Sequence, residues 1–487
     1  MESSHIKPNY TKIIGLLAGP LVFLSLLLIP NPTPLDDTAW HVISMAAWMV
    51  VWWVTEAVPI PVTAILPMSA MPLLGIFSIR EATAPYADPI IFLFMGGFLI
   101  ALAMEKWNLH KRIALTLISN TGTHADGIIL GFMLATGFLS MWISNTATAV
   151  MMLPIAMSVI SLLTEELGLD QTDVRFRRFA LSLLLGIAYA ANIGGASTII
   201  GTPPNVVMLG YINEFYGFDI TFSEWLILGL PICALILALT YLLLTKWFFP
   251  NKLGHLEGSK EIITRELRAM GPISGPEKRV LAIFVLTALG WMLLQPLNGL
   301  IGKPLLNNTV VAMAGGTLMF LFPLDLKKGK FLLDWETTSR LPWGILLLFG
   351  GGLCLARAMQ STGIIELVGN YISEGGPYPQ WMLVLILTSV MLFMTELMSN
   401  VALVTVFLPV VIGIGQALAL PPLLLVAPAT IAASCAFMMP ISTPPNAIVF
   451  ASGHIQIKDM AKTGFWLNLL AIIVLVIFAI TVIPLLS

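Results

Sequence analysis

Charge is scarce in this sequence. Only 10% of its 487 residues are Asp, Glu, Lys or Arg, whereas 57% are hydrophobic, and the mean hydropathy is +0.91. A soluble chain of this length would form about three domains with about 25% charged residues. The shortage of charge therefore excludes a soluble protein, and the apolar content excludes a disordered one. An all-α polytopic membrane protein remains.

Several kinds of functional site are also missing. The net charge of −2 provides no basic stripe to meet phosphates, which excludes nucleic acid as a partner. The three cysteines lie far apart in apolar runs, and no histidines have the spacing of metal ligands. The sequence contains no HExxH motif, no cluster of catalytic carboxylates and no plausible Ser/His pair. We therefore expect neither an enzyme nor an organic cofactor.

Eleven apolar runs are long enough to span a bilayer, which needs about 20 mostly apolar residues. They lie at 13–30, 40–57, 60–78, 89–105, 178–200, 223–249, 280–298, 308–325, 342–360, 424–450 and 463–486. No cleavage site follows the first run, so we interpret residues 1–39 as an N-terminal segment with the first span, not as a signal peptide.

Two further apolar stretches, 127–163 and 380–416, are too long for one helix. Each contains a small polar cluster near its middle, Ser-Asn-Thr at 144–146 and Ser-Asn-Val at 399–401. We interpret each stretch as a re-entrant hairpin, because non-helical backbone at membrane depth needs protein or a cavity to cover it. The alternative is two ordinary spans joined by a short polar loop, and hydropathy alone does not decide between them.

The placement of basic residues indicates the orientation. With a cytoplasmic N-terminus, 21 of the 24 Lys and Arg residues, Lys7 among them, lie on the cytoplasmic side, as the positive-inside rule requires. Only Arg80, Lys303 and Arg357 fall elsewhere, and Arg357 is expected to reach the outer interface. The hydrophilic connection 250–279 is then a cytoplasmic linker, and the C-terminus lies outside the plasma (inner) membrane.

An internal repeat relates two halves of the chain, 40–249 and 280–487. After a shift of 255 residues, seven of thirteen positions match between 93–105 and 348–360, and the Ser-Asn pairs of the two hairpins coincide. The sequence Thr-Pro-Pro-Asn occurs in each half, before 206 and before 447. Each half carries five spans and one hairpin, so the second copy is inverted. Inverted repeats with interrupted helices are typical of secondary transporters, whose substrates bind near the midplane.

The interrupted segments have the chemistry of an anion site. Ser, Thr and Asn are favoured N-caps and Pro suits the first helical position, so helices should begin after both hairpin clusters, after Thr202 and after Thr443. Their positive ends would converge on an anion with two carboxylates. No Lys or Arg lies within 113–174 or 358–457. The anion must therefore be held by backbone dipoles, neutral donors or co-bound cations, and the last of these makes Na⁺ coupling coherent.

One acidic residue lies close to this chemistry. Glu396 precedes Asn400 by one helical turn, and intramembrane acids tend to be functional. It either ligates an ion directly or forms a hydrogen bond that fixes the hairpin, and the second interpretation is slightly favoured.

These motifs resemble the divalent anion/sodium symporter family, the INDY-type dicarboxylate transporters, over nearly the whole chain. The resemblance is carried by the hairpin clusters and by segments 53–59, 192–205 and 434–449. It implies an elevator-type homodimer, with scaffold and transport domains, that takes up C4-dicarboxylates such as succinate, malate and fumarate with Na⁺. It implies two Na⁺ sites, one formed by Ser140, Ser144, Asn145 and Gly201, the other by Thr395, Met398, Asn400 and Ser442. The implied substrate contacts are Asn145, Thr146, Thr202, Pro203, Asn400, Val401, Thr443 and Pro444.

One position departs from the family pattern. Val401 stands where many members have Thr in the second hairpin, so a hydroxyl donor for the second carboxylate is missing. The balance between dicarboxylate and tricarboxylate is therefore open. A Na⁺-independent dicarboxylate exchanger and a citrate or sulfate transporter of the same family are the main alternatives, and a channel is a more distant one.

Overall fold

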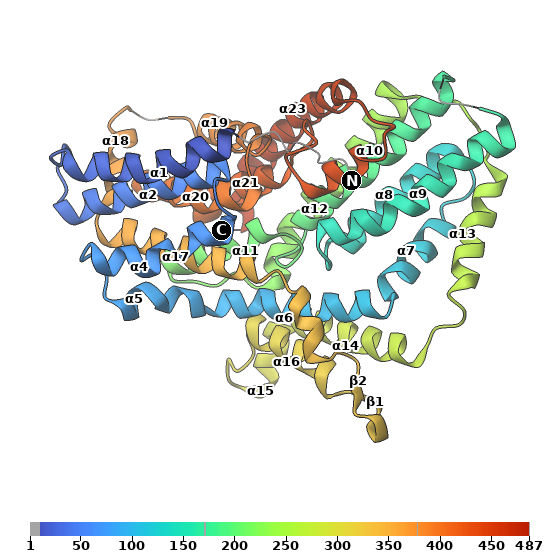
Figure 1. The fold of residues 1–487 in the computed structure, drawn as a ribbon, viewed down its shortest axis with the longest axis horizontal. Helices are drawn as coiled ribbons and strands as arrows, with labels where there is room; N and C mark the ends of the chain where they lie inside the picture. The colour runs from blue at the N-terminus through green and yellow to red at the C-terminus, as the bar shows by residue number, and fades with distance from the viewer. Residues whose placement is uncertain (1–9, 170–171, 377, 487) are drawn as a thin grey trace, which may run out of the picture.

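The computed structural model describes residues 10–169, 172–376 and 378–486, so Lys7 lies outside the described residues. Figure 1 shows the arrangement. The first half comprises α1 (Tyr10–Leu28), α2 (Asp37–Thr55), α3 (Ile60–Ala64), α4 (Leu66–Leu73), α5 (Ile79–Thr83), η1 (Ala84–Ala87), α6 (Pro89–Lys106), α7 (Leu109–Ser119), α8 (Ala125–Ser140), α9 (Asn145–Leu167), α10 (Val174–Ala196), α11 (Pro203–Tyr216), α12 (Phe222–Leu242) and η2 (Leu243–Phe248).

The second half is also helical, apart from one two-stranded antiparallel ribbon in which Pro323 faces Phe331. It comprises α13 (Glu257–Ala269), α14 (Gly275–Met292), α15 (Leu294–Ile301), α16 (Asn308–Leu321), β1 (Pro323–Asp325), η3 (Leu326–Lys328), β2 (Lys330–Phe331), η4 (Trp335–Arg340), α17 (Trp343–Ser361), α18 (Ile364–Ser373), α19 (Gln380–Met394), α20 (Asn400–Ala417), α21 (Pro422–Ser434), α22 (Pro444–Phe450), α23 (Ile457–Thr481) and α24 (Ile483–Leu486). The predicted linker 250–279 therefore contains a helix of its own, α13.

Eight of the described helices are long and apolar enough to cross a membrane, or nine if the bent pair α14–α15 counts as one span. The predicted eleven spans are not all single helices. The run 60–78 forms the short helices α3 and α4, 280–298 bends by 76° between α14 and α15, and 424–450 unwinds between α21 and α22. A proline follows each break, and proline disfavours a continuous helix because it lacks an N–H and clashes with the preceding turn. Pro67 lies in the first turn of α4, Pro296 follows the bend, and Pro444 starts α22 after the unwound segment.

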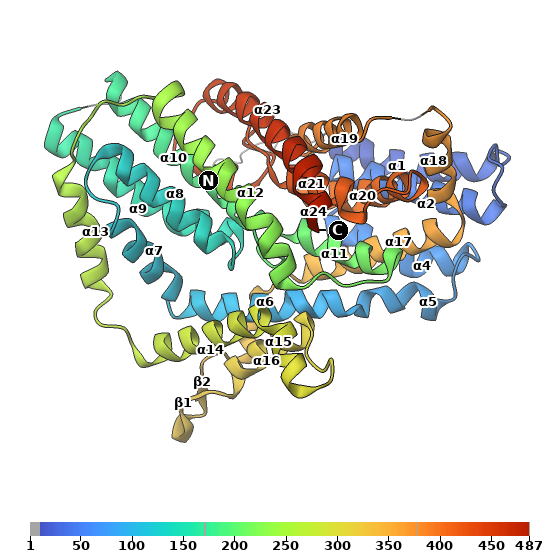
Figure 2. The same ribbon diagram turned by 180° about the vertical axis from the view of Figure 1, so that it is seen from behind.

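The helices pack mainly in two sets, which the contact of α11 with α17 joins. In one, α8 and α9 pack on α10, and α19 and α20 pack on α21, which also contacts α23. In the other, α6 packs on α16 and α17 packs on α3. The apolar part of α10 is entirely buried, whereas only 11% of that of α1 is. α10 is thus enclosed by neighbours such as α8, α9 and α12, whereas α1 lies at the periphery beside α2, as Figures 1 and 2 show.

The two halves meet through equivalent helices. α22 packs against α9 and α10, and α11 packs against α20 and α21. α11 and α22 follow the two Thr-Pro-Pro-Asn motifs, and α9 and α20 follow the two hairpin clusters. Each contact is therefore the counterpart of the other, as a pseudo-twofold relation between the halves requires.

Candidate functional site

The tip of the first hairpin lies between α8 and α9. Ser144 is the N-cap of α9, and its side chain accepts a hydrogen bond from Ala147 N at 3.2 Å. Ser140, the last residue of α8, donates to Asn145 Oδ1 at 2.5 Å. The predicted start of a helix after this cluster is confirmed, and the N–H groups of its first turn face the tip.

The tip of the second hairpin repeats this contact. Thr395 donates to Asn400 Oδ1 at 2.6 Å, and its hydroxyl also lies 2.6 Å from the carbonyl oxygen of Ala433. The repeat offset of the sequence pairs Thr395 with Ser140 and Asn400 with Asn145. α20 begins after Ser399 as predicted, but the Ser399 side chain forms no capping hydrogen bond. Ser399 therefore occupies the N-cap position of α20, but its side chain does not cap the helix.

Two unwound segments lie beside the hairpin tips, at 197–202 and at 435–443. In the first, the Asn205 amide donates to the carbonyl oxygens of Ala196 at 2.9 Å and Thr198 at 2.7 Å. In the second, the Asn446 amide donates to those of Ala436 at 3.0 Å and Met439 at 3.1 Å. Each Asn therefore holds the open backbone that precedes its own helix, in nearly the same way in both halves.

α10 brings parts of both halves together. Asn192 donates to the Thr443 hydroxyl at 3.1 Å, which joins α10 to the second unwound segment. One turn later, a methyl group built on Gly195 would lie only 2.4 Å from Asn145 Oδ1. Asn145, at the tip of the first hairpin, therefore packs directly against the backbone of Gly195. The second unwound segment, from the other half of the chain, contacts α10 one turn earlier, at Asn192.

Glu396 organises the second unwound segment. Its buried carboxylate accepts hydrogen bonds from the backbone N–H groups of Phe437, Met438 and Met439 at 2.7, 2.9 and 3.2 Å, and from the Asn468 amide at 2.9 Å. Four donors satisfy a buried carboxylate. The predicted hydrogen-bonding role of Glu396 is confirmed, although it fixes the unwound backbone and not the hairpin tip.

The predicted residues differ in their exposure. Among the predicted Na⁺ ligands, Ser140, Gly201, Thr395, Met398 and Ser442 are buried, whereas Ser144, Asn145 and Asn400 are half-buried. Among the predicted substrate contacts, Thr146 and Pro444 are exposed, Pro203 and Val401 are half-buried, and Thr202 and Thr443 are buried. The hydroxyl residues Ser140 and Thr395, and likewise Thr202 and Thr443, are thus more buried than Asn145 and Asn400 at the hairpin tips.

The charges around the site are few. No group of three or more His, Cys, Asp or Glu residues in the described part of the chain has the geometry of a metal site. Arg357 is not isolated, because its guanidinium forms a two-pronged ion pair with Glu214 at 2.8 and 2.6 Å. Such a pair stabilises an arginine within a span, and its position at the outer interface stays a prediction.

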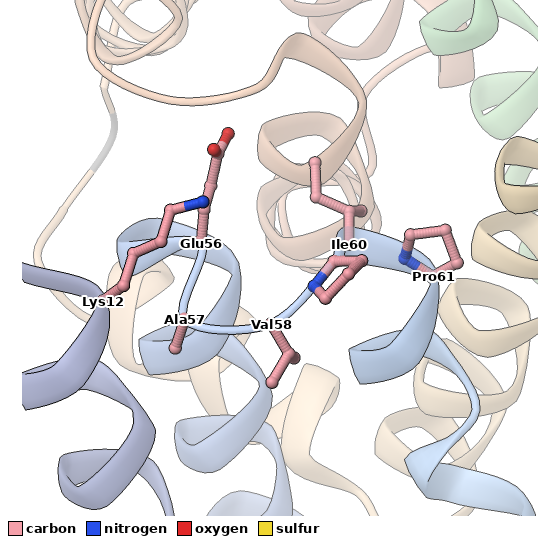
Figure 3. A pocket seen from close by; sticks show the side chains of 7 residues that line it. Lys12, Glu56, Ala57, Val58, Ile60 and Pro61 are labelled. Carbon is pink, nitrogen blue, oxygen red and sulfur yellow. The ribbon is translucent and has the colours of Figure 1, made fainter. Parts of the chain in front are cut away.

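Figure 3 shows a hollow of about 360 Å³ at the ends of α1 and α2, away from these residues. It is lined by Lys12, Glu56, Ala57, Val58, Pro59, Ile60 and Pro61. None of the predicted site residues borders it.

The sequence profile of the sodium:sulfate symporter transmembrane region matches residues 10–487. The chain belongs to this family. Two relatives are the sodium-dependent dicarboxylate transporters SdcS of Staphylococcus saprophyticus and Staphylococcus aureus strain USA300. The first is 40% identical over 98% of this chain and 92% of the relative, and the second 40% identical over 97% and 91%. The chain is therefore a multi-pass membrane protein of a transporter family.

Solved structures support the fold. The Alcanivorax borkumensis YdaH transporter, described as having an unusual topology, aligns with a TM-score of 0.60 at 14% identity, covering 98% of this chain and all of that one. Neisseria gonorrhoeae MtrF, described as illuminating a class of antimetabolite efflux pumps, aligns with a TM-score of 0.57 at 12% identity, covering 98% and 96%. At this identity the similarity concerns the fold alone.

Sequence reasoning missed the residues that hold the site open. Asn192, Asn205 and Asn446 belong to recognised motifs, but their hydrogen bonds to carbonyl oxygens of the unwound segments were not predicted. The repeat contains a signal for two of them, because Asn ends both Thr-Pro-Pro-Asn sequences. No comparable signal marks Asn192 or Gly195, whose partners are distant in the chain.

Proposed function

We propose that this protein is a secondary active transporter that couples the uptake of C4-dicarboxylates, such as succinate, malate and fumarate, to Na⁺. Its relatives at 40% identity are named sodium-dependent dicarboxylate transporters, and the family is described by sodium:sulfate symport. The observation that carries the proposal is the duplicated hydroxyl–amide contact at the two hairpin tips, Ser140–Asn145 and Thr395–Asn400.

The oxygen atoms of these contacts suit Na⁺. The Thr395 hydroxyl has one proton but lies 2.6 Å from two acceptor oxygens, those of Asn400 and Ala433. A hard cation among these oxygens would satisfy all of them. In this proposal, Ser140, Ser144, Asn145 and the Gly201 carbonyl hold one Na⁺, and Thr395, Asn400 and the carbonyls of Met398 and Ser442 hold the second.

The substrate would lie above the ions, at the hairpin tips. The first turns of α9 and α20 present N–H groups there, whereas α11 begins with two prolines that have no N–H to offer. Asn145, Thr146, Thr202, Asn400 and Thr443 add neutral donors. Pro203, Val401 and Pro444 complete the walls. Because no basic side chain belongs to this set, the bound Na⁺ ions supply the positive charge that attracts a dianion.

Transport would proceed by an elevator movement. The hairpins with α10–α12 and α21–α23 would form the transport domain, and α1–α6 with α14–α17 the scaffold, since each group has its own dense packing. The scaffold would pair two copies into a homodimer. We further propose a cytoplasmic N-terminus and an outer C-terminus, from the distribution of basic residues.

The decisive experiment measures uptake of labelled succinate into proteoliposomes, with an inward Na⁺ gradient or with matched choline. Asn145→Ala and Asn400→Ala should each lower uptake by roughly ten- to a hundred-fold, because each removes an oxygen that contacts an ion. Asn213→Ala is the control, since the Asn213 amide lies on α11 but bonds to Asp219 at 2.8 Å.

The outcomes separate the alternatives. Uptake that depends on Na⁺ and is blocked only by dicarboxylates supports the proposal. Equal uptake without Na⁺, seen only in vesicles preloaded with dicarboxylate, would indicate an exchanger. Competition by citrate or sulfate at matched concentration would indicate a tricarboxylate or sulfate transporter. Wild-type uptake by both Asn variants would refute the assigned site.

A further inference from the structure

The β1–β2 ribbon, residues Pro323–Phe331, stands apart from the helical body, and both views show it projecting beyond α16 (Figures 1 and 2). Its turn carries Lys327 and Lys328, and β2 begins with Lys330; all three side chains are exposed. We call this segment the basic ribbon. Nothing in the transport proposal uses it.

The basic ribbon is firmly anchored. Leu333 N donates to Met319 O of α16 at 2.9 Å, and the Trp107 indole donates to Leu332 O at 2.9 Å. Arg279, near the start of α14, donates to Pro323 O. The ribbon therefore sits where the ends of α6, α14 and α16 meet. Such a ring of helix ends marks the boundary between the apolar core of a membrane protein and water.

The lysines of the basic ribbon are short of acidic partners. Many other cations of the described chain are matched, for example Lys106 with Asp334, Lys111 with Glu266 and Arg340 with Glu105. Lys327 and Lys330 pair with no carboxylate among the described residues, and Lys328 lies 3.9 Å from Asp325. Asp325 itself is engaged by the backbone, since it accepts from Lys327 N at 3.0 Å.

Two further exposed cations, Lys278 and Arg279, lie at the base of the ribbon on α14. The nearby acids are Asp334, which is paired with Lys106, and Glu336, which is exposed. Together with the three lysines, the surface carries a clear excess of positive charge.

Apolar side chains accompany these cations. Leu326 is 75% exposed, Trp335 74% and Phe331 37%. Such exposure is unfavourable in water, and the mixture of lysine, leucine and tryptophan is typical of side chains that lie between lipid headgroups. Another exposed group of cations, Lys260, Arg265 and Arg268 on α13, lies on a polar helix face without exposed aromatic neighbours.

We propose that the basic ribbon binds the headgroups of anionic lipids in the bilayer around the transporter. The three lysines and Arg279 would contact the phosphates, while Leu326 and Trp335 would insert among the upper acyl carbons. Clusters of basic residues next to a membrane helix attract anionic lipid in this way. The surface would give the protein a preferred lipid neighbour at one edge, independently of its substrate.

The test counts lipids retained by the purified full-length protein. The protein is mixed with equal amounts of phosphatidylglycerol and phosphatidylcholine and analysed by native mass spectrometry. The triple variant K327A/K328A/K330A should lose the preference for phosphatidylglycerol by about ten-fold or more, since each lysine contributes roughly five-fold. The control K260A/R265A/R268A removes the same charge from α13 and should keep the preference.

A second variant separates lipid binding from simple anion binding. Leu326→Ala leaves every charge in place and should lower phosphatidylglycerol retention several-fold, because it removes the inserted side chain. An equal loss in both triple variants, or no loss in the ribbon triple, would overturn the proposal. Displacement of the lipid by millimolar inorganic phosphate with no effect of Leu326→Ala would also overturn it, in favour of a site for soluble anions.

Discussion

Because Gly195 has no side chain, the Asn145 amide packs directly against the backbone of α10. A Cβ atom added at Gly195 would lie only 2.4 Å from Asn145 Oδ1. Gly195→Ala should therefore displace the amide and raise the Na⁺ concentration for half-maximal succinate uptake by about ten-fold, the cost of one disturbed ligand. Ala favours a helix over Gly by about 1 kcal/mol. We thus expect lost uptake with little or no loss of thermal stability.

Gly97→Ala is the matched control for this prediction. Gly97 also lies in a buried helix, but its built Cβ would meet Ile200 at 3.5 Å, an ordinary contact. Uptake and Na⁺ dependence should stay close to those of the wild type. Similar Na⁺ responses in the two variants would show that the contact between Gly195 and Asn145 does not position the amide.

Residue by residue, the repeat marks equivalent positions that lie near one another in the chain. Ser140 and Asn145, like Thr395 and Asn400, are five residues apart and recur at the repeat offset, but their hydrogen bonds were not predicted. Their roles as ion ligands came from the family resemblance and stay predictions. The Asn192–Thr443 bond joins residues from different halves. A single sequence contains no information on which distant side chains meet, and this bond could not be predicted.

At the scale of elements, η4 is attached to α6 by two ion pairs, Lys106–Asp334 and Arg340–Glu105. The Lys106 ammonium and the Thr337 hydroxyl lower the pKa of Asp334 to about 2. An unfolded Asp has a pKa of about 3.9. The folded pKa is the lower one, so the ionised carboxylate stabilises the attachment above about pH 4, and this stability is lost as the pH falls toward 2.

Asp334→Asn should therefore loosen η4 at neutral pH. The Asn side chain can still cap Thr337, so only the charge is lost, at a cost of about 1 kcal/mol or less for an exposed pair. Hydrogen exchange of residues 330–341 should quicken by up to about five-fold at low salt, and high salt should remove the difference. Glu336→Gln removes one charge from the same turn without breaking an ion pair, and equal exchange in both variants would contradict the prediction.

Elements also show where sequence reasoning was limited. The helix breaks at both polar clusters were predicted because Ser144 and Ser399 interrupt runs too long for one helix. The re-entrant course of these segments stays a prediction, since α9 and α20 are each long and apolar enough to cross a membrane. The breaks in 60–78 and 280–298 were missed, although Pro67 and Pro296 lie within them. Membrane helices tolerate proline where neighbours satisfy the freed backbone groups. The outcome at each proline therefore depends on tertiary contacts that hydropathy does not record.

For the whole molecule, the Glu214–Arg357 pair has a mechanical consequence. α11 carries the predicted substrate contact Thr202 at its start and Glu214 near its end, whereas Arg357 lies on α17. In the proposed elevator these helices belong to different domains. A two-pronged pair between them, at 2.8 and 2.6 Å, must break whenever the transport domain moves, so it favours the present arrangement of the two domains.

A covalent bond at this place should stop transport. The double variant E214C/R357C removes both charges together, which leaves no buried charge without a partner, and the three native cysteines are buried. A short thiol-specific cross-linker should abolish succinate uptake, and reductive cleavage of the linker should restore it. The control R177C/D459C replaces an ion pair of 2.8 Å between α10 and α23, both assigned to the transport domain. Cross-linking it should leave uptake intact. Continued uptake by fully cross-linked E214C/R357C would mean that α11 and α17 move as one body, and the domain division would have to be drawn elsewhere.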